Sequence, residues 1–224
     1  MKKSTVILYI LFVFALSISL ALPLRLSRSV NQLLGYTFVI DPGHGGKDDG
    51  TSYDGVAEDE VNLAISTYLY ELCIDEGAFV IITRTGDYDL ASLYASNRKR
   101  EDLAKRVAYI NQSQANLFIS IHMNAYRSES VKGPMVYVKK NDEESHHLGQ
   151  EILQVFNKEF KQDKPLHEEE FYLFKRTSIP GVLVECGFLS NTEERKLLTT
   201  PSYQKKMAKY LYQGIYDYLQ GKKI

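Results

Sequence analysis

Short runs of consecutive apolar residues alternate along the chain with longer segments in which apolar residues recur at helical spacing. The short runs are rich in Val, Ile and Phe and are bounded by turn residues, which is typical of buried strands. They predict strands at 37–41, 78–84, 117–121, 133–139 and 181–184. The periodic segments predict helices over 58–76, 97–114 and 143–160. Two more helices are expected near the C-terminus.

The starts of these last two helices have recognisable signals. Ser190 and Glu193 have the spacing of a capping box, and Thr200 is followed by Pro201, a residue favoured in the first helical turn. Strands and helices therefore alternate through most of the chain, and 224 residues suit one domain with a tail. This pattern predicts an α/β fold with a mainly parallel sheet, because a strand-helix-strand unit normally joins parallel strands.

The first 24 residues are predicted to lie outside this fold. Lys2 and Lys3 precede an uncharged apolar run from Val6 to Leu22, which is long enough to cross a bilayer as a helix. The segment is either a signal anchor, which we favour for its length, or a cleavable signal peptide. In both cases the rest of the chain lies outside the cytoplasm. Residues 25–34 then form a linker, and the domain is expected over 35–224.

Composition narrows the possible functions. The formal net charge is −1, which does not indicate a nucleic-acid-binding surface. The chain has only two cysteines, Cys73 and Cys186, so neither a disulfide framework nor a cysteine-based zinc site is expected. Both are interpreted as buried small hydrophobic residues. The helix over 97–114 is strongly basic, and its cations are expected on a solvated face, with contact to an anionic polymer as the alternative. These cations are Arg98, Lys99, Arg100, Lys105 and Arg106.

Three ionisable residues follow the ends of predicted strands. His44 lies in the turn Gly43–Gly46 after the first strand, His122 follows Ile121, and Glu185 follows Val184. In an open parallel sheet, ligands bind beyond the carboxyl ends of the strands. The three residues are therefore expected to converge at one edge of the sheet, although they are far apart in sequence.

Two histidines and a carboxylate can bind zinc and leave one coordination position for water. The expected third ligand is Glu58, at the start of the helix that follows the His44 turn, with Asp59 and Glu60 as competitors. Glu185 then suits a proton carrier that does not bind the metal. Each residue also has a structural interpretation: Glu58 as a first-turn acid, Glu185 as an ion-pair partner and His122 as a core histidine. The remaining histidines are expected to be exposed and unrelated to the site; they are His146, His147 and His167.

Three motifs in order resemble the zinc-dependent N-acetylmuramoyl-L-alanine amidases, the type 3 peptidoglycan amidases. They are Val-Ile-Asp-Pro-Gly-His-Gly-Gly at 39–46, Ser-Ile-His-Met-Asn-Ala at 120–125 and Val-Glu-Cys-Gly-Phe-Leu-Ser-Asn at 184–191. The resemblance covers about Tyr36 to Leu219 and implies a single α/β domain whose sheet has about six strands with flanking helices.

The same resemblance implies a zinc ion held by His44, Glu58 and His122, with Glu185 as the catalytic glutamate. It implies hydrolysis of the amide bond between N-acetylmuramic acid and L-alanine in peptidoglycan. A membrane segment followed by one catalytic domain is similar to the germination-specific amidases that act on spore cortex. The rival hypotheses are a peptidoglycan-binding protein without catalysis and a zinc peptidase on a similar fold. The sequence does not identify a protein activator.

Overall fold

A six-stranded sheet forms the centre of the structure, a computed structural model that describes residues 31–222. Its strand order is β4-β1-β5-β8-β6-β7, and the four strands from β4 to β8 are parallel. Strand β6 is antiparallel to β8, and β7 is parallel to β6. The strands are β1 (Thr37–Pro42), β4 (Phe79–Ile82), β5 (Leu117–Asn124), β6 (Met135–Lys139), β7 (His167–Glu169) and β8 (Gly181–Phe188). The predicted α/β fold with a mainly parallel six-stranded sheet is therefore confirmed.

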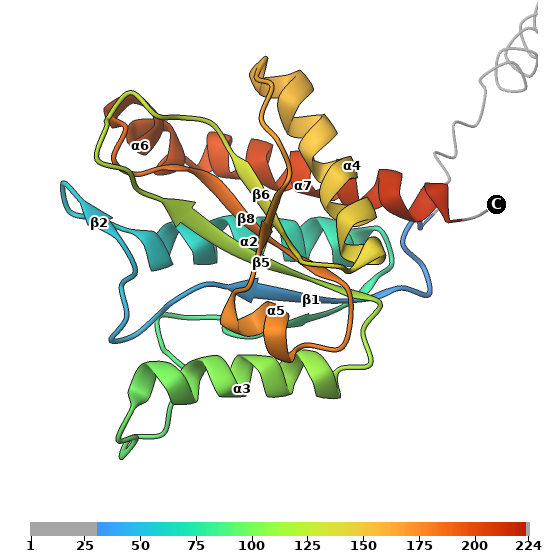
Figure 1. The fold of residues 1–224 in the computed structure, drawn as a ribbon, viewed down its shortest axis with the longest axis horizontal. Helices are drawn as coiled ribbons and strands as arrows, with labels where there is room; N and C mark the ends of the chain where they lie inside the picture. The colour runs from blue at the N-terminus through green and yellow to red at the C-terminus, as the bar shows by residue number, and fades with distance from the viewer. Residues whose placement is uncertain (1–30, 223–224) are drawn as a thin grey trace, which may run out of the picture. The chain divides into compact units, whose positions relative to one another are not determined.

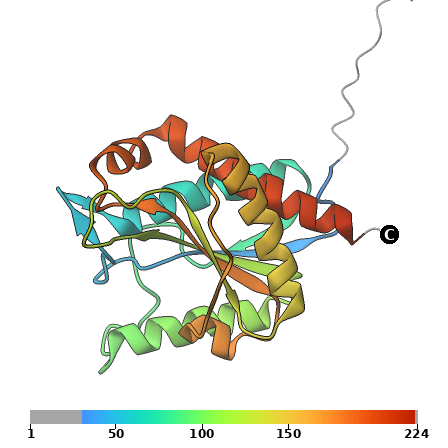
Figure 2. The same ribbon diagram turned by 45° about the horizontal axis from the view of Figure 1, so that its top comes forward.

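Helices cover both faces of this sheet (Figures 1 and 2). One face carries α2 (Glu58–Asp75), α4 (Glu143–Phe160) and α7 (Pro201–Gly221), which enclose the larger core. The other face carries α3 (Arg98–Gln112) and α5 (Tyr172–Arg176), which enclose a smaller core. The short helix α6 (Thr192–Leu198) follows β8.

The two cores follow from the alternation of side chains along the central strands. In β5, Leu117, Ile119 and Ile121 enter the larger core and Phe118 enters the smaller one. Because successive side chains point to opposite faces, Ser120 and His122 face the same side as Phe118. The same rule places Glu185 of β8 beside Leu183, on the α3 and α5 side. At the carboxyl end of the sheet, the side chains on this face are therefore polar.

Several elements differ from the predictions. Asn191, not Ser190, caps α6 and accepts a hydrogen bond from the Glu194 backbone N–H, because its backbone is extended at the helix start. Residues 52–57 form a hairpin that was not predicted, made of β2 (Ser52–Tyr53) and β3 (Val56–Ala57). The segment over 161–170 contains β7, and α5 follows it; neither element was predicted.

The C-terminal end of the predicted linker takes part in the fold. Leu33, in the segment expected to be a linker, is fully buried in the larger core, so packing begins before residue 35. The apolar segment within residues 1–24, expected to be an anchor or signal peptide, lies outside the described residues. Among residues 31–222, no helix is long and apolar enough to span a membrane.

Candidate metal centre

The turn after β1 projects His44 over the carboxyl end of the sheet. His44 has a positive φ of 61°, and Gly45 and Gly46 have φ of 124° and 65°. Glycine tolerates this left-handed region and most other residues do not, which explains the Gly-rich sequence of the turn. The backbone N–H of Gly43 donates to the Ile121 carbonyl at 2.9 Å, which ties the turn to β5.

Two buried arginines bind the backbone carbonyl groups of this turn. Arg84 donates to the carbonyl oxygens of Pro42 and Gly43 at 3.1 and 2.9 Å. Arg106 donates to the carbonyl oxygens of Pro42 and His44, both at 2.6 Å. Each arginine is 1% exposed. Three consecutive carbonyl groups are therefore fixed by guanidinium groups, which hold the backbone that carries His44.

Arg106 corrects the prediction that the cations of α3 share a solvated face. It is ion-paired with Asp41 and Asp102, both at 2.8 Å. Burial acts to raise the pKa of Asp41, but the Arg106 charge and the hydrogen bonds from Thr83 and Ser120 hold that pKa below its usual value. Arg106 therefore lies on the inward face of α3, where its guanidinium group binds carbonyl groups of the turn.

Replacing Arg106 should therefore destabilise the protein strongly. We expect Arg106→Met to lower the free energy of unfolding by about 3–5 kcal/mol, because it leaves the buried Asp41 carboxylate without its partner. The matched control is Lys105→Met, which removes an exposed i,i+4 ion pair with Glu101 and should cost less than about 1 kcal/mol. Urea unfolding of both variants measures the difference, and equal losses would contradict this role for Arg106.

His122 and Glu185 lie side by side on adjacent strands. They are paired in the register of β5 and β8 and, by the alternation described above, project from the same face of the sheet. The His122 ring packs against Gly43 so closely that a Cβ atom at position 43 would lie 2.2 Å from its Cε1 atom. The glycine before His44 therefore also makes room for the second histidine.

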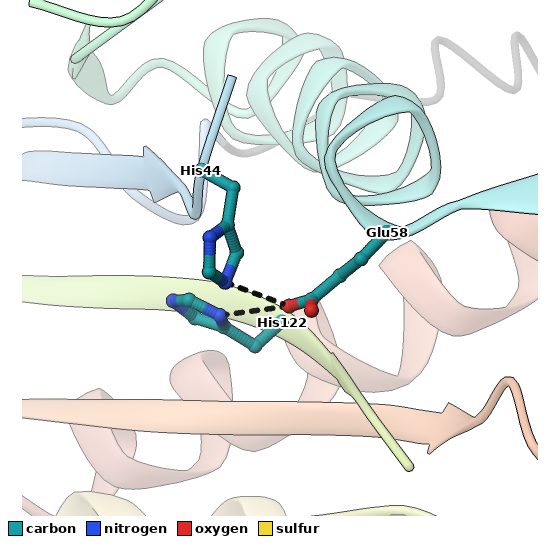
Figure 3. Close-up of side chains that lie close together, drawn as sticks. All are labelled: His44, Glu58 and His122. Carbon is teal, nitrogen blue, oxygen red and sulfur yellow. Dashed lines mark hydrogen bonds and ion pairs between the residues drawn. The ribbon is translucent and has the colours of Figure 1, made fainter. Parts of the chain in front are cut away.

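Glu58 completes the cluster from the first turn of α2. Its Oε1 atom lies 3.3 Å from His44 Nε2 and 2.9 Å from His122 Nδ1 (Figure 3). The same oxygen accepts a hydrogen bond from the Met123 backbone N–H at 3.2 Å, and Oε2 accepts one from the Thr51 N–H at 2.9 Å. The hairpin that delivers Thr51 to this position was missed, although its Asp54-Gly55 turn is a known hairpin signal.

The geometry distinguishes Glu58 from its sequence neighbours. Asp59 is influenced by the Arg84 and Asp87 charges, away from the histidines, and Glu60 is exposed. Burial acts to raise the pKa of Glu58, but hydrogen bonds and charge from His122 and His44 hold that pKa well below its usual value. Burial acts to lower the pKa of His44, but Glu58 and then Asp48 raise it. These three side chains are thus strongly coupled electrostatically.

The donor set fits a metal ion. One ligand atom from each of His44, Glu58 and His122 can be chosen so that all lie within 4.8 Å of one another. Two imidazoles and one carboxylate are a known donor set for catalytic zinc. The other histidines lie outside this cluster: His146 contacts Glu168 at 2.9 Å, and His147 lies 3.7 Å from Glu151. His167 is half-buried against Tyr137, whereas an exposed position was expected.

Glu185 differs from every other carboxylate near the cluster. Its Oε2 atom is buried and has no hydrogen-bond partner within residues 31–222. Burial, and secondly the charge of Glu58, raise the pKa of Glu185 to about 8. A carboxyl group with such a pKa exchanges protons near neutral pH, as a general acid-base catalyst must.

Two cavities meet at the cluster, and both are lined by His44, His122 and Glu185. One, of about 360 Å³, has apolar walls that include Leu103 of α3 and Phe171 and Tyr172 of the α5 segment. The other, of about 340 Å³, is polar and is lined by Thr51 and Asn124, among others. An apolar and a polar cavity therefore share the same ionisable groups. The wall from α5 was not predicted.

Comparisons with known proteins agree with this geometry. The family model described as N-acetylmuramoyl-L-alanine amidase matches residues 38–217. The germination-specific N-acetylmuramoyl-L-alanine amidase of Bacillus subtilis (strain 168) is 36% identical over 197 residues, which cover 85% of this chain and 82% of that protein.

Solved structures give the same result. The CwlD amidase of Clostridioides difficile, solved in complex with the GerS lipoprotein, superposes with a TM-score of 0.80 at 35% identity, covering 83% of this chain and 99% of that one. The catalytic domain of CwlV from Bacillus (Paenibacillus) polymyxa var. colistinus has a TM-score of 0.72 at 28% identity, covering 83% and 98%.

A histidine and carboxylate cluster beside a buried carboxyl group with a raised pKa suits hydrolytic chemistry. The extent of the family match makes the class specific: the chain belongs to the N-acetylmuramoyl-L-alanine amidase family. It is an enzyme that hydrolyses the amide bond between N-acetylmuramic acid and L-alanine in peptidoglycan.

Proposed function

We propose that this amidase depends on zinc, that His44, Glu58 and His122 hold the ion, and that Glu185 transfers the proton. The observation that carries the proposal is the position of Glu58 Oε1 between the two imidazole nitrogens, 3.3 Å from His44 and 2.9 Å from His122. These groups come from a turn, a helix start and a strand, and a shared metal ion accounts for their convergence. Glu185 lines the same two cavities as the histidines.

The bound zinc would supply Lewis acidity, by lowering the pKa of water and polarising the amide carbonyl. Glu185 would accept a proton from the water that attacks the amide carbon. When the carbon–nitrogen bond breaks, Glu185 would return this proton to the nitrogen of L-alanine, which leaves as a free amine. The products are a lactyl carboxylate on the muramic acid and a stem peptide with a new N-terminus, so the atoms of one water molecule are accounted for.

The setting of the reaction is inferred from the relatives. The Bacillus subtilis relative is named as germination-specific, which supports spore cortex peptidoglycan as the substrate of this chain. The Clostridioides difficile relative was solved with a lipoprotein, which supports a protein partner. Residues 1–24 support an extracytoplasmic location, either anchored in the membrane or secreted. No nucleic acid is expected to take part.

Digestion of purified peptidoglycan tests this function. The full-length protein would be incubated with vegetative wall and with spore cortex, either zinc-loaded, treated with a chelator, or treated and then resupplied with zinc. Mass spectrometry should find stem peptides with a free alanine amine and glycan strands with unsubstituted muramic acid, in the zinc-loaded and resupplied samples only.

The alternative functions give different products. Free amino acids would indicate a zinc peptidase. Stoichiometric zinc with no cleavage of either substrate would indicate a peptidoglycan-binding protein. Unchanged cleavage in the chelated sample, with zinc shown to be absent, would contradict the dependence on zinc.

A further inference from the structure

His44 has a second carboxylate partner on the opposite side of its ring. While Nε2 points toward Glu58, the Nδ1 atom lies 3.1 Å from Asp48 Oδ1. Asp48 lies four residues after His44, in the polar loop that follows the glycine turn. It has no place in the catalytic scheme described so far.

The loop holds Asp48 in this position through several hydrogen bonds. Gly45 and Asp48 exchange backbone hydrogen bonds, with N···O distances of 2.9 and 3.2 Å, and form an isolated β-bridge. The Gly50 backbone N–H donates to Oδ1 at 3.3 Å, and Lys99 Nζ lies 3.5 Å from Oδ2. The side chain of Asp48 is 35% exposed, but its backbone and carboxylate are both tied to neighbours. The contact with His44 is therefore built into the loop.

We propose that Asp48 is a positioning residue for His44, an inference that rests on the proposed role of His44 as a zinc ligand. The Nδ1 atom of His44 faces the Asp48 carboxylate at 3.1 Å, and Nε2 faces Glu58 at 3.3 Å. In the proposed tautomer Nδ1 carries the proton and shares it with Asp48, so the Nε2 lone pair is directed toward Glu58. A carboxylate that accepts the second ring N–H of a ligand fixes its tautomer and orientation and makes the imidazole a stronger donor. Asp48 does not bind the ion itself, because it contacts the nitrogen on the far side of the ring.

The two histidine rings differ in how closely glycine backbone encloses them. The His122 ring is confined by the backbone of Gly43, where an added Cβ atom would lie within 2.2–2.7 Å of its ring atoms. The ring of His44 projects from a turn and lies beside Gly50, where an added Cβ atom would be 2.9 Å from its Cδ2 atom, so it is less tightly enclosed than the His122 ring. The Asp48 carboxylate, 3.1 Å from Nδ1, is a polar partner that can fix the orientation of this ring. Asp48 is therefore expected to matter for His44 and not for His122.

Zinc affinity of the full-length protein tests the inference without any substrate. Asp48→Ala should bind zinc about 10- to 100-fold more weakly than the wild type in competition with a chromophoric chelator. Asp48→Asn keeps an acceptor oxygen without the charge, so it should fall between the wild type and Asp48→Ala. The matched control is Asp49→Asn, which removes an adjacent exposed acid and should leave affinity unchanged. Lys99→Met should change affinity little, because exposed ion pairs are weak.

A spectroscopic measurement separates positioning from a general loss of structure. In the zinc-loaded wild type, the imidazole ¹⁵N spectrum should show a His44 Nδ1 that keeps its proton and is hydrogen-bonded. Asp48→Ala should lose the hydrogen-bonded character of this signal, while the His122 signals and the thermal stability of the zinc-free protein stay close to those of the wild type.

Three results would overturn the inference: wild-type affinity in Asp48→Ala, an equal loss in Asp49→Asn, or an unchanged His44 Nδ1 signal in Asp48→Ala. Absence of zinc binding in the wild type would overturn it as well, together with the proposed metal. If the wild type binds zinc with the expected Asp48 dependence but cleaves no peptidoglycan, the proposed function fails and the inference stands.

Discussion

Glu185→Gln is expected to lower kcat by about 10²- to 10⁴-fold while the protein still folds and binds zinc. The substitution keeps the shape of the side chain but removes its ability to accept a proton from water. The buried Oε2 atom has no hydrogen-bond partner within residues 31–222, so the native carboxylate is not engaged in a structural ion pair there. Steady-state assays on purified peptidoglycan measure the loss, and metal analysis measures zinc stoichiometry.

Folding is expected to tolerate this change well. Burial raises the pKa of Glu185 to about 8, with a further contribution from the Glu58 charge, so the fold is expected to accept a neutral group at this position. A neutral amide of the same size removes the repulsion between Glu185 and Glu58. Unfolding midpoints close to that of the wild type would therefore separate a catalytic defect from a structural one.

The matched control is Glu60→Gln, which removes an exposed carboxylate at the start of α2. It should retain wild-type activity, because Glu60 does not approach the histidine cluster. Full activity in Glu185→Gln would show that another group carries the proton and would remove Glu185 from the scheme. Loss of zinc together with activity would instead assign Glu185 to the metal-binding set.

The position of the site could be predicted from the sequence because two simple rules determine it. Parallel strands end at one edge, and alternate residues of a strand share a face. In the structure β5 and β8 continue to Asn124 and Phe188, past the ends predicted at residues 121 and 184, so His122 and Glu185 lie within these strands. The two strands are neighbours and pair these residues in register, which the sequence did not predict. The turn after β1 adds His44 at the same edge. The roles assigned to these residues remain predictions, because geometry brings them together without testing their chemistry.

The supporting contacts were harder to predict because they depend on the tertiary fold. Arg106 was assigned to a solvated face on the basis of its charge, although its spacing from Leu103 and Ile110 places it on the inner stripe of α3. Asp48 lies in a polar loop without periodicity, and only the folded turn brings it to His44. β7 has three residues and exists through its pairing with β6, so no local pattern indicates it.

Gly43→Ala is expected to weaken zinc binding more than about 100-fold. This exceeds the usual loss when a residue that hydrogen-bonds a metal-binding side chain is removed. An added Cβ atom would lie 2.2 Å from His122 Cε1, 2.3 Å from Nε2 and 2.7 Å from Nδ1. These distances are far below van der Waals contact, and they involve the ring itself, not the end of a flexible chain. Gly43 does not have a positive φ, so the penalty comes from the collision with His122 and not from backbone strain.

Because Gly43 is fixed by the hydrogen bonds of Arg84 and Ile121, the ring of His122 is the group that must move. Its displacement takes Nδ1 away from Glu58 Oε1, which lies 2.9 Å from it in the native arrangement. Zinc affinity and peptidoglycan cleavage should therefore fall together, unlike in Glu185→Gln. The control is Gly221→Ala near the end of α7, where the new methyl group meets only His147 at ordinary contact distance, 3.5 Å or more, and no change is expected. Wild-type zinc affinity in Gly43→Ala would show that His122 binds no metal in the orientation described.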